Sequence, residues 1–278
     1  MRIDRFATLH VFHPLAVRES GPRRVPILMY HSISDANETR HPYFRTSTSA
    51  TMFETQMRFL SENRYQSVGL GVALDVLEGR RADLVKPVVI TFDDGFRDFR
   101  SRAFPVLAAC GHIATMFLPT GHIEDHPSQL KGIETLTWSE ISELEREGIE
   151  FGSHTVTHPQ LRTLPPVKVD EELRQSKRTI EDRLGKPVKY FSYPYAFPEN
   201  ARSFVGRLRE TLAACGYLAG VSTMIGTATQ GEDPFFLRRL PANSSDDILL
   251  FRAKLERGYD WLHTLQRWKK SLLPSAAV

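Results

Sequence analysis

Short apolar runs alternate with amphipathic segments along most of the chain. Several runs are apolar without any polar alternation, as expected for strands that are covered on both faces. We expect strands over residues 25–31, 87–93, 114–119, 149–154, 190–195, 217–223 and 235–242. Alternation of strands with helices favours a parallel sheet, either a barrel or a doubly wound layer. In a parallel barrel the carboxyl ends of the strands share one face, and catalytic side chains gather there.

The segments between these runs predict helices. Residues 49–64 carry apolar side chains at helical spacing. Residues 137–148 begin with the capping-box pattern Thr137-Trp138-Ser139-Glu140 and end at Gly148. Further helices are expected over residues 97–110, 166–184 and 200–215.

The two ends of the chain have a different pattern from the middle. Residues 1–24 contain the breakers Pro14, Gly21 and Pro22, so we expect an irregular N-terminal arm before a main domain over residues 25–243. Residues 244–278 are expected to form a C-terminal amphipathic helix that docks on this domain. Its apolar positions follow a 3.6-residue period: Ile248, Phe251, Leu255, Tyr259, Leu262 and Leu265. The alternative is that Trp261, Trp268, Lys269 and Lys270 meet a membrane surface or a protein partner.

Composition excludes several classes of protein. The 36 basic and 33 acidic residues leave a net charge of +3, which is too small an excess to indicate nucleic-acid binding. We find neither a signal-peptide pattern nor an apolar run that could span a membrane, so a cytoplasmic location is expected. Cys110 and Cys215 lack metal-ligand spacing and are expected to be buried free thiols.

The strongest local signal is a pair of adjacent carboxylates at a strand end. The apolar run Val88-Val89-Ile90 leads directly into Thr91-Phe92-Asp93-Asp94-Gly95. Two like charges side by side raise the free energy of the doubly ionised state, and a cation or a shared proton relieves it. The structural alternative is that one aspartate caps the following helix while the other faces solvent.

A second signal is the segment Gly152-Ser153-His154-Thr155-Val156-Thr157-His158-Pro159, again at a strand end. Two imidazoles four residues apart can bind one metal ion, although the HxxxH pattern by itself is weak evidence. His122 and His126 repeat the spacing in a polar loop, where solvated side chains are the simpler interpretation.

If Asp94, His154 and His158 meet, they form a set of two histidines and one carboxylate with open coordination positions. Such a set holds zinc or another divalent ion and leaves room for water. The ion lowers the pKa of that water and polarises a carbonyl oxygen. Asp93, next to the ligand, is then the candidate general base.

The third signal is Phe191-Ser192-Tyr193-Pro194-Tyr195-Ala196. A proline before an aromatic residue at a strand end can fix the backbone so that one amide N–H points at an oxyanion. The alternative is an aromatic-rich core strand that ends in a turn.

Together these segments resemble the motifs of the polysaccharide deacetylase family, also called the NodB-homology domain or carbohydrate esterase family 4. Thr91–Gly95 is similar to its first motif, in which the first aspartate is the base and the second binds metal. Gly152–His158 resembles its His-Ser/Thr-x-x-His metal motif. Ser192–Tyr195 matches its Arg-x-Pro-Tyr motif only in the last two residues. The resemblance covers residues 25–243.

This resemblance implies a single distorted (β/α)7-type barrel with parallel strands. It also implies metal-dependent hydrolysis of N-acetyl groups on amino-sugar (N-acetylglucosamine-type) poly- or oligosaccharides. In the implied mechanism a metal-bound water attacks the acetamide carbonyl. The oxyanion is held by the metal and the Tyr195 backbone N–H, and a protonated histidine donates to the leaving amine.

The chain departs from the family pattern at two positions. Ser192 stands where the third motif has arginine, and Arg239, in the last expected strand, is our candidate for the missing charge. No Leu-x-His motif lies near the C-terminus. Leu28-Met29-Tyr30-His31 resembles instead the permuted arrangement of deacetylases of exported poly-N-acetylglucosamine, so we expect His31 to be the general acid rather than a structural histidine. Both departures favour the exopolysaccharide branch over chitin enzymes.

Other functions remain open at this point. Two histidines and a carboxylate also suit a non-haem Fe(II) oxygenase, and the set accepts Zn²⁺, Co²⁺, Ni²⁺ or Fe²⁺. Ser192 suggests a second alternative, a sugar-binding protein on an inactive deacetylase scaffold. A third is hydrolysis of a non-sugar amide. Zinc and an acetylated amino-sugar substrate are our principal expectations, with an intracellular or membrane-attached intermediate as that substrate and a peripheral-membrane or polysaccharide-synthesis partner.

Overall fold

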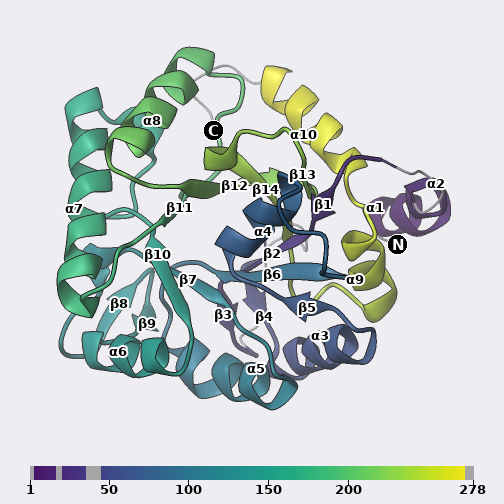
Figure 1. Cartoon of the computed structure of the whole chain (residues 1–278), viewed down its shortest axis with the longest axis horizontal. Coiled ribbons are helices and arrows are strands. Elements are labelled where there is room, and N and C mark those ends of the chain that lie inside the picture. Colours follow the sequence, from purple (N-terminus) through teal and green to yellow (C-terminus); the bar gives the residue numbers. More distant parts are fainter. Residues whose placement is uncertain (1–2, 17–20, 36–44, 273–278) are drawn as a thin grey trace.

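The fold is a closed barrel of parallel strands surrounded by helices, as expected from the sequence (Figure 1). We analysed a computed structural model that describes residues 3–16, 21–35 and 45–272, with side chains up to residue 266. Neighbouring strands follow the order β2-β14-β12-β11-β10-β7-β6, and β6 pairs with β2 to close the ring. The strands are β2 (Ile27–Tyr30), β6 (Pro87–Phe92), β7 (Thr115–Leu118), β10 (Glu150–Ser153), β11 (Tyr190–Ser192), β12 (Ala219–Ile225) and β14 (Leu237–Pro241).

Each predicted apolar run overlaps one of these barrel strands, and β12 extends two residues beyond the run predicted over 217–223. β6 shows why the runs lack alternation, since every residue from Val88 to Phe92 is buried. One of its faces lines the barrel interior and the other is covered by helices. The run at 235–242 was only partly strand, because Pro234–Phe236 form a 3₁₀ turn before β14.

The predicted helices are present and lie around the barrel (Figure 1). Thr137 and Glu140 form the expected reciprocal cap, which satisfies two backbone N–H groups at the start of α6. Ser49 caps the first turn of α3 by accepting from the N–H of Met52. The helices are α3 (Ala50–Glu62), α5 (Phe104–Cys110, after a π-helical turn at Phe99–Ala103), α6 (Trp138–Arg146), α7 (Pro166–Leu184) and α8 (Arg202–Ala214).

Short elements extend this framework. β5 (Gln66–Ser67) pairs with the outer edge of β6, and three small pairs lie outside the barrel. These are β1 (Arg24–Val25) with β13 (Ala228–Thr229), β3 (Ser32–Ile33) with β4 (Ser47–Thr48), and the hairpin of β8 (Ser128–Leu130) and β9 (Ile133–Thr135). Helix α4 (Leu70–Leu77), which periodicity did not predict, packs against an apolar cluster formed by residues of the barrel strands.

The barrel interior changes from apolar to polar along each strand. Val89 of β6 and Leu237 of β14 belong to an apolar cluster that also includes buried residues of α4. Two residues further along the same strands, on the same faces, stand Thr91 and Arg239. The period of two therefore puts hydrophobic packing at the amino ends of the strands and polar chemistry toward their carboxyl ends.

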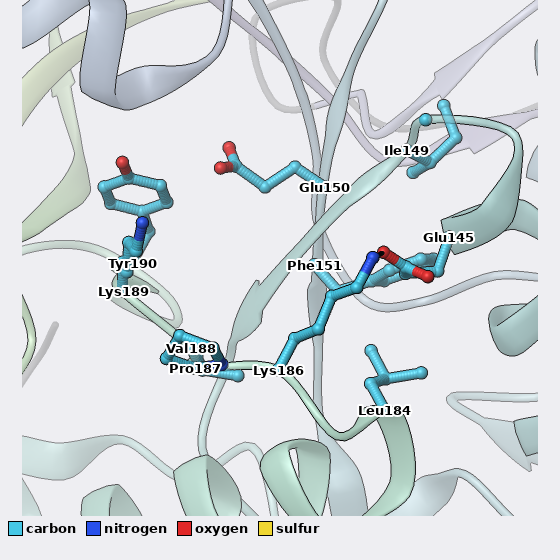
Figure 2. A pocket seen from close by; sticks show the side chains of 11 residues that line it. Glu145, Ile149, Glu150, Phe151, Leu184, Lys186, Pro187, Val188, Lys189 and Tyr190 are labelled. Atoms are coloured by element: carbon cyan, nitrogen blue, oxygen red, sulfur yellow. Dashed lines mark hydrogen bonds and ion pairs between the residues drawn. The ribbon is translucent and has the colours of Figure 1, made fainter.

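A pocket of about 330 Å³ opens near the amino ends of β10 and β11 (Figure 2). Glu150 and Tyr190, the first residues of these strands, line it, and Lys186 reaches Glu145 across it. The Glu150 carboxylate accepts from the Thr115 hydroxyl at 2.8 Å. This pocket is at the opposite end of the strands from the motifs described above. Parallel barrels place structural contacts, rather than catalytic ones, at this amino end.

The expectation of an irregular N-terminal arm is wrong for residues 3–16. These residues are helical, in α1 (Ile3–Ala7), a π-helical turn (Thr8–Phe12) and α2 (His13–Ala16). Pro14 does not end this segment, because the helical backbone continues through the π-helical turn directly into α2. This segment packs against the C-terminal region through Phe12 stacked on Trp261.

The C-terminal region forms two helices instead of the single expected one. α9 (Ile248–Leu255) and α10 (Trp261–Leu272) are separated by a turn that contains Gly258. A Cβ at Gly258 would lie 2.7 Å from His13 Cβ, so the close approach of the N-terminal helix explains the break. Phe251, Tyr259 and Leu262 are buried as expected, whereas Leu265 is exposed.

Trp261, one of the residues considered for a membrane or partner surface, packs inside the protein. The Trp261 indole N–H donates to the Thr8 hydroxyl, so this side chain packs within the protein. The side chains of Trp268, Lys269 and Lys270 lie outside the described residues. None of the described helices combines the length and apolarity needed to cross a bilayer. Cys110 and Cys215 are free thiols, half-buried rather than buried.

Candidate active site

The aspartate pair lies where β6 ends. Asp93 continues the strand, with its N–H donating to Tyr30 O at 3.0 Å, and its side chain enters the barrel. Asp94 then turns the chain with a φ of +72°, followed by Gly95 at +64°. This left-handed turn points the two adjacent carboxylates at different partners, although both are buried. The structural alternative, with one aspartate in solvent, is excluded by their burial.

Asp94 faces the two histidines of the second motif. Its Oδ1 lies 3.0 Å from His158 Nε2 and 3.5 Å from His154 Nε2. One ligand atom from each residue lies within 4.8 Å of the other two. His154 donates from Nδ1 to Ser192 O at 2.8 Å, which fixes the ring with its Nε2 directed at the cluster. The backbone of Thr155 and His158 (φ +73° and +54°) bends the HxxxH segment so that both rings converge.

The chemistry of this trio fits a divalent cation. Among the described residues, the buried Asp94 Oδ1 accepts no hydrogen bond of good geometry and His158 Nδ1 has no partner. Burial lowers the pKa of His158, so its imidazole is neutral near pH 7, as a metal ligand must be. Burial alone would raise the pKa of Asp94, but the two histidines lower it well below its usual range. One anionic oxygen and two neutral nitrogens are a typical donor set for zinc.

Asp93 is instead held by an arginine from β14, which β2 separates from β6 in the barrel. Arg239 of β14 donates to both carboxylate oxygens, at 2.9 Å and 2.7 Å, and is fully buried. Burial opposes ionisation of Asp93, but the Arg239 guanidinium and then His154 lower its pKa to about 2. The carboxylate is therefore ionised at any physiological pH, as a general base must be.

Ser192, the departure from the third motif, belongs to the same network. Its hydroxyl donates to Asp93 Oδ1 at 3.1 Å and accepts from Arg239 Nη2 at 3.1 Å. The resemblance predicted an arginine on β11, at the position of Ser192. In this chain the guanidinium beside Asp93 belongs to Arg239 of β14 instead. Arg239 is further fixed by donating to Thr91 Oγ1 and Ser222 O.

His31 lies on the solvent side of Asp93. It follows β2, and its Nε2 is 3.9 Å from Asp93 Oδ2. Burial lowers the pKa of His31, and the carboxylates of Asp93 and Asp94 only partly offset this. The imidazole therefore lies beside the aspartate pair, and 19% of its side chain is exposed.

Tyr195, the remaining predicted site residue, lies beside His158. Its backbone has a φ of +59°, and its ring packs edge-on against His158 at 4.7 Å between centroids. Among the described residues, none accepts a hydrogen bond from its backbone N–H. An oriented but unpaired amide beside two metal-ligand candidates is the geometry expected of an oxyanion donor.

Backbone strain is concentrated around these residues. Of the seven described non-glycine residues with positive φ, five lie here: Asp94, Lys131, Thr155, His158 and Tyr195. Such conformations cost roughly 1–3 kcal/mol each and persist where the surrounding structure enforces them, typically at functional sites.

Lys131 is a site residue that sequence reasoning missed. It occupies the turn of the β8–β9 hairpin, and its ammonium is 3.4 Å from Asp94 Oδ2 and 5.2 Å from the centroid of the Tyr195 ring. The hairpin lies far from every motif in the sequence, and only the Lys131-Gly132 turn signal marks it.

The rival histidine pair does not join the cluster. His122 ends a 3₁₀ turn, and His126 is exposed with its ring near Pro127 O. Within the described chain, the candidate metal trio is Asp94, His154 and His158.

Several known proteins resemble this chain in sequence or in fold. The family model for polysaccharide deacetylases matches residues 80–218. YxkH of Bacillus subtilis, itself assigned to the polysaccharide deacetylases, is 32% identical over 244 residues, which cover 86% of this chain and 79% of that protein. Poly-β-1,6-N-acetyl-D-glucosamine N-deacetylase of Escherichia coli K12 is 32% identical over 139 residues, 46% of this chain and 20% of that protein. The deacetylase PplD of Streptococcus pyogenes, solved with acetate, shares the fold with a TM-score of 0.72 at 23% identity, covering 84% and 99% of the two chains.

Proposed function

Because the chain belongs to the polysaccharide deacetylase family, whose members hydrolyse amide bonds of acetylated sugar polymers, we propose that it removes the acetyl group from N-acetylglucosamine-type units. The observation that carries the proposal is the division of the adjacent carboxylates. Asp94 faces two imidazoles, and Asp93 is paired with Arg239. We therefore propose that Asp94 binds the metal ion and that Asp93 is the general base.

A divalent ion fits between Asp94, His154 and His158, and when bound it would polarise the acetamide carbonyl and lower the pKa of a water molecule. We propose zinc, for which one carboxylate and two imidazoles are a common ligand set. Ser192 O fixes the His154 ring in the tautomer that presents Nε2, so this part of the site is preorganised.

Asp93 accepts the proton that the attacking water loses. The bidentate contact with Arg239 keeps the carboxylate ionised and fixes its orientation, so that one oxygen faces the site. His31 Nε2, 3.9 Å from Asp93 Oδ2, takes this proton and donates it to the nitrogen of the breaking C–N bond. The water hydroxyl thereby joins the acetyl carbon, and the proton leaves with the free amine.

The Tyr195 backbone N–H stabilises the carbonyl oxygen as it gains negative charge. Its left-handed backbone holds the amide in place before substrate binds, so no reorganisation is needed during the reaction. Loss of one such donor typically costs a factor of about 10²–10³ in rate.

The substrate class rests on the relatives and on the position of His31. The E. coli relative is named for deacetylation of poly-β-1,6-N-acetyl-D-glucosamine, although the alignment spans about one fifth of that protein. The general-acid histidine at the end of the first barrel strand supports the same exopolysaccharide branch. We therefore propose an N-acetylated glucosamine oligomer or polymer as substrate.

An oxygenase would leave the Asp93–Arg239 pair without a task, since iron chemistry needs no base at that position. The test is an acetate-release assay with Zn²⁺- or Co²⁺-loaded protein on β-1,6- and β-1,4-linked N-acetylglucosamine oligomers and on a non-sugar acetamide. Release from a glucosamine oligomer is expected. Release only from the non-sugar amide, or from none of them, would overturn the proposal.

A further inference from the structure

We propose that the C-terminal helix α10 is a positioning element of the active site, and that Gln266 acts there through a bulge in β12. The inference deepens the proposed function, because it explains how the Tyr195 amide and Arg239 are held. Gln266 itself lies away from the reacting groups. In Figure 1, α10 lies along the side of the barrel next to β12.

The bulge is visible in the pairing of β12 with β14. Val221 pairs with Leu237, but the next pair is Ile225 with Arg239. A step of four residues on β12 therefore faces a step of two on β14. Residues 222–224 lie opposite the single residue 238, so they cannot all pair with β14, and they turn their side chains and carbonyls in new directions.

Residues of the bulge contact both Arg239 and the turn that carries Tyr195. Ser222 O accepts from Arg239 Nε at 2.9 Å, which fixes the guanidinium that pairs with Asp93. The Thr223 hydroxyl donates to Tyr195 O at 2.9 Å and accepts from the Phe197 N–H at 2.8 Å. One hydroxyl thus fixes both ends of the turn that carries the strained Tyr195 backbone.

Gln266 takes the place of a strand partner on the other side of β12, where β11 ends at Ser192 and residues 223 and 225 have no neighbouring strand among the described elements. Its Nε2 donates to Thr223 O at 3.3 Å, and its Oε1 accepts from the Ile225 N–H at 3.1 Å. Without this amide, two backbone groups of a partly buried strand would lose their partners, at a cost of about 1–3 kcal/mol each. Residues 223–225 would then shift, and the Thr223 hydroxyl would no longer be held against the Tyr195 turn.

A second contact between α10 and the same loop supports a positioning role. His263 Nε2 lies 2.9 Å from Glu199 Oε2, in the segment that follows the Tyr195 turn. The helix therefore contacts the bulge at residue 266 and the loop at residue 263, one turn apart. A helix that served only to cover apolar surface would need neither polar contact.

The test uses Gln266→Ala and Thr223→Val, with Thr223→Ser as the conservative variant. The control for Gln266→Ala is Thr264→Ala, on an exposed face of the same helix. The control for Thr223→Val is Thr229→Val, whose hydroxyl donates to Thr227 O in the outer β13. Hydrogen exchange of residues 193–199 and steady-state deacetylation are measured on metal-loaded proteins, with metal affinity measured in parallel.

We expect faster exchange in residues 193–199 for Gln266→Ala and Thr223→Val, and a kcat about 10- to 100-fold lower, because small displacements at a reacting centre have effects of this size. KM and metal affinity stay within about twofold, and Thr223→Ser recovers most of kcat, as expected for positioning. Unchanged exchange in both variants overturns the inference. Unchanged kcat in an active enzyme also overturns it. If the unmodified protein releases no acetate, the proposed function fails, and the exchange data alone decide whether α10 holds the loop. Should Gln266→Ala not fold, the isosteric Thr223→Val carries the test.

Discussion

Arg239 and Asp93 form a bidentate ion pair inside the barrel, with N–O distances of 2.9 Å and 2.7 Å and almost no exposure to solvent. The pair joins the last strand, β14, to the first motif at the end of β6. Its consequence is a carboxylate that is both buried and ionised, next to a second carboxylate free to bind a metal ion.

Arg239→Met should strongly destabilise the protein. It leaves the Asp93 charge buried without a partner, which costs about 3–5 kcal/mol in the free energy of unfolding near pH 7. The pKa of Asp93 is lowered from 3.8 to about 2, so the stabilisation by the pair is complete above pH 3.8 and lost as pH falls through 2. Urea unfolding at several pH values should therefore show a difference that shrinks on acidification.

The matched control is Arg238→Met, in which a partly buried arginine on the same strand loses its contact with Glu232. We expect a change below about 1 kcal/mol, because ion pairs near solvent contribute little. Equal losses for the two variants would contradict the role given to the Arg239–Asp93 pair.

Metal binding should raise the melting temperature through Asp94, His154 and His158. An ion at 100 times its Kd stabilises the folded state by about 2.7 kcal/mol. The shift should disappear in Asp94→Asn and persist in His126→Gln, which removes a histidine of the rival pair. Loss of the shift in His126→Gln alone would place the ion elsewhere.

Lys131→Met should tighten metal binding. The ammonium lies 3.4 Å from Asp94 Oδ2, so it competes with a divalent cation for that carboxylate. We expect Kd for Co²⁺ to fall by about 3- to 10-fold at low ionic strength, less at high salt because screening weakens the competing charge. Calorimetric titration measures this, with Lys86→Met as control. Weaker binding in Lys131→Met would show that Lys131 supports the metal site instead.

His31→Gln tests the proton donor. Loss of a positioned acid typically costs a factor of about 10²–10⁴ in kcat. Metal affinity should be nearly unchanged, since Nε2 of His31 faces Asp93 rather than the metal trio. Full activity in His31→Gln would show that His31 is a structural histidine and not the proton donor.

Much of the architecture was predictable because the barrel strands are buried on both faces. Their apolar runs are distinct in the sequence, and motif residues follow directly after them, as Asp93 follows β6. Arg239 was proposed to replace the arginine missing at Ser192, and its guanidinium contacts both oxygens of Asp93.

Other features depend on contacts that no local pattern encodes. Lys131 reaches Asp94 from a hairpin between two barrel strands, and the hairpin carries no motif. The break before α10 follows from the approach of His13 to Gly258, residues at opposite ends of the chain. The bulge at 222–224 depends on the register against β14, which periodicity does not specify.

The most direct test of the account compares Asp93→Asn with Asp94→Asn in one experiment that measures acetate release and metal affinity on the same samples. We expect Asp93→Asn to bind metal normally while kcat falls by at least about 100-fold, and Asp94→Asn to lose metal affinity and activity together. Equal loss of metal affinity in both variants, or a fully active Asp93→Asn, would contradict the division of the aspartate pair into a base and a metal ligand.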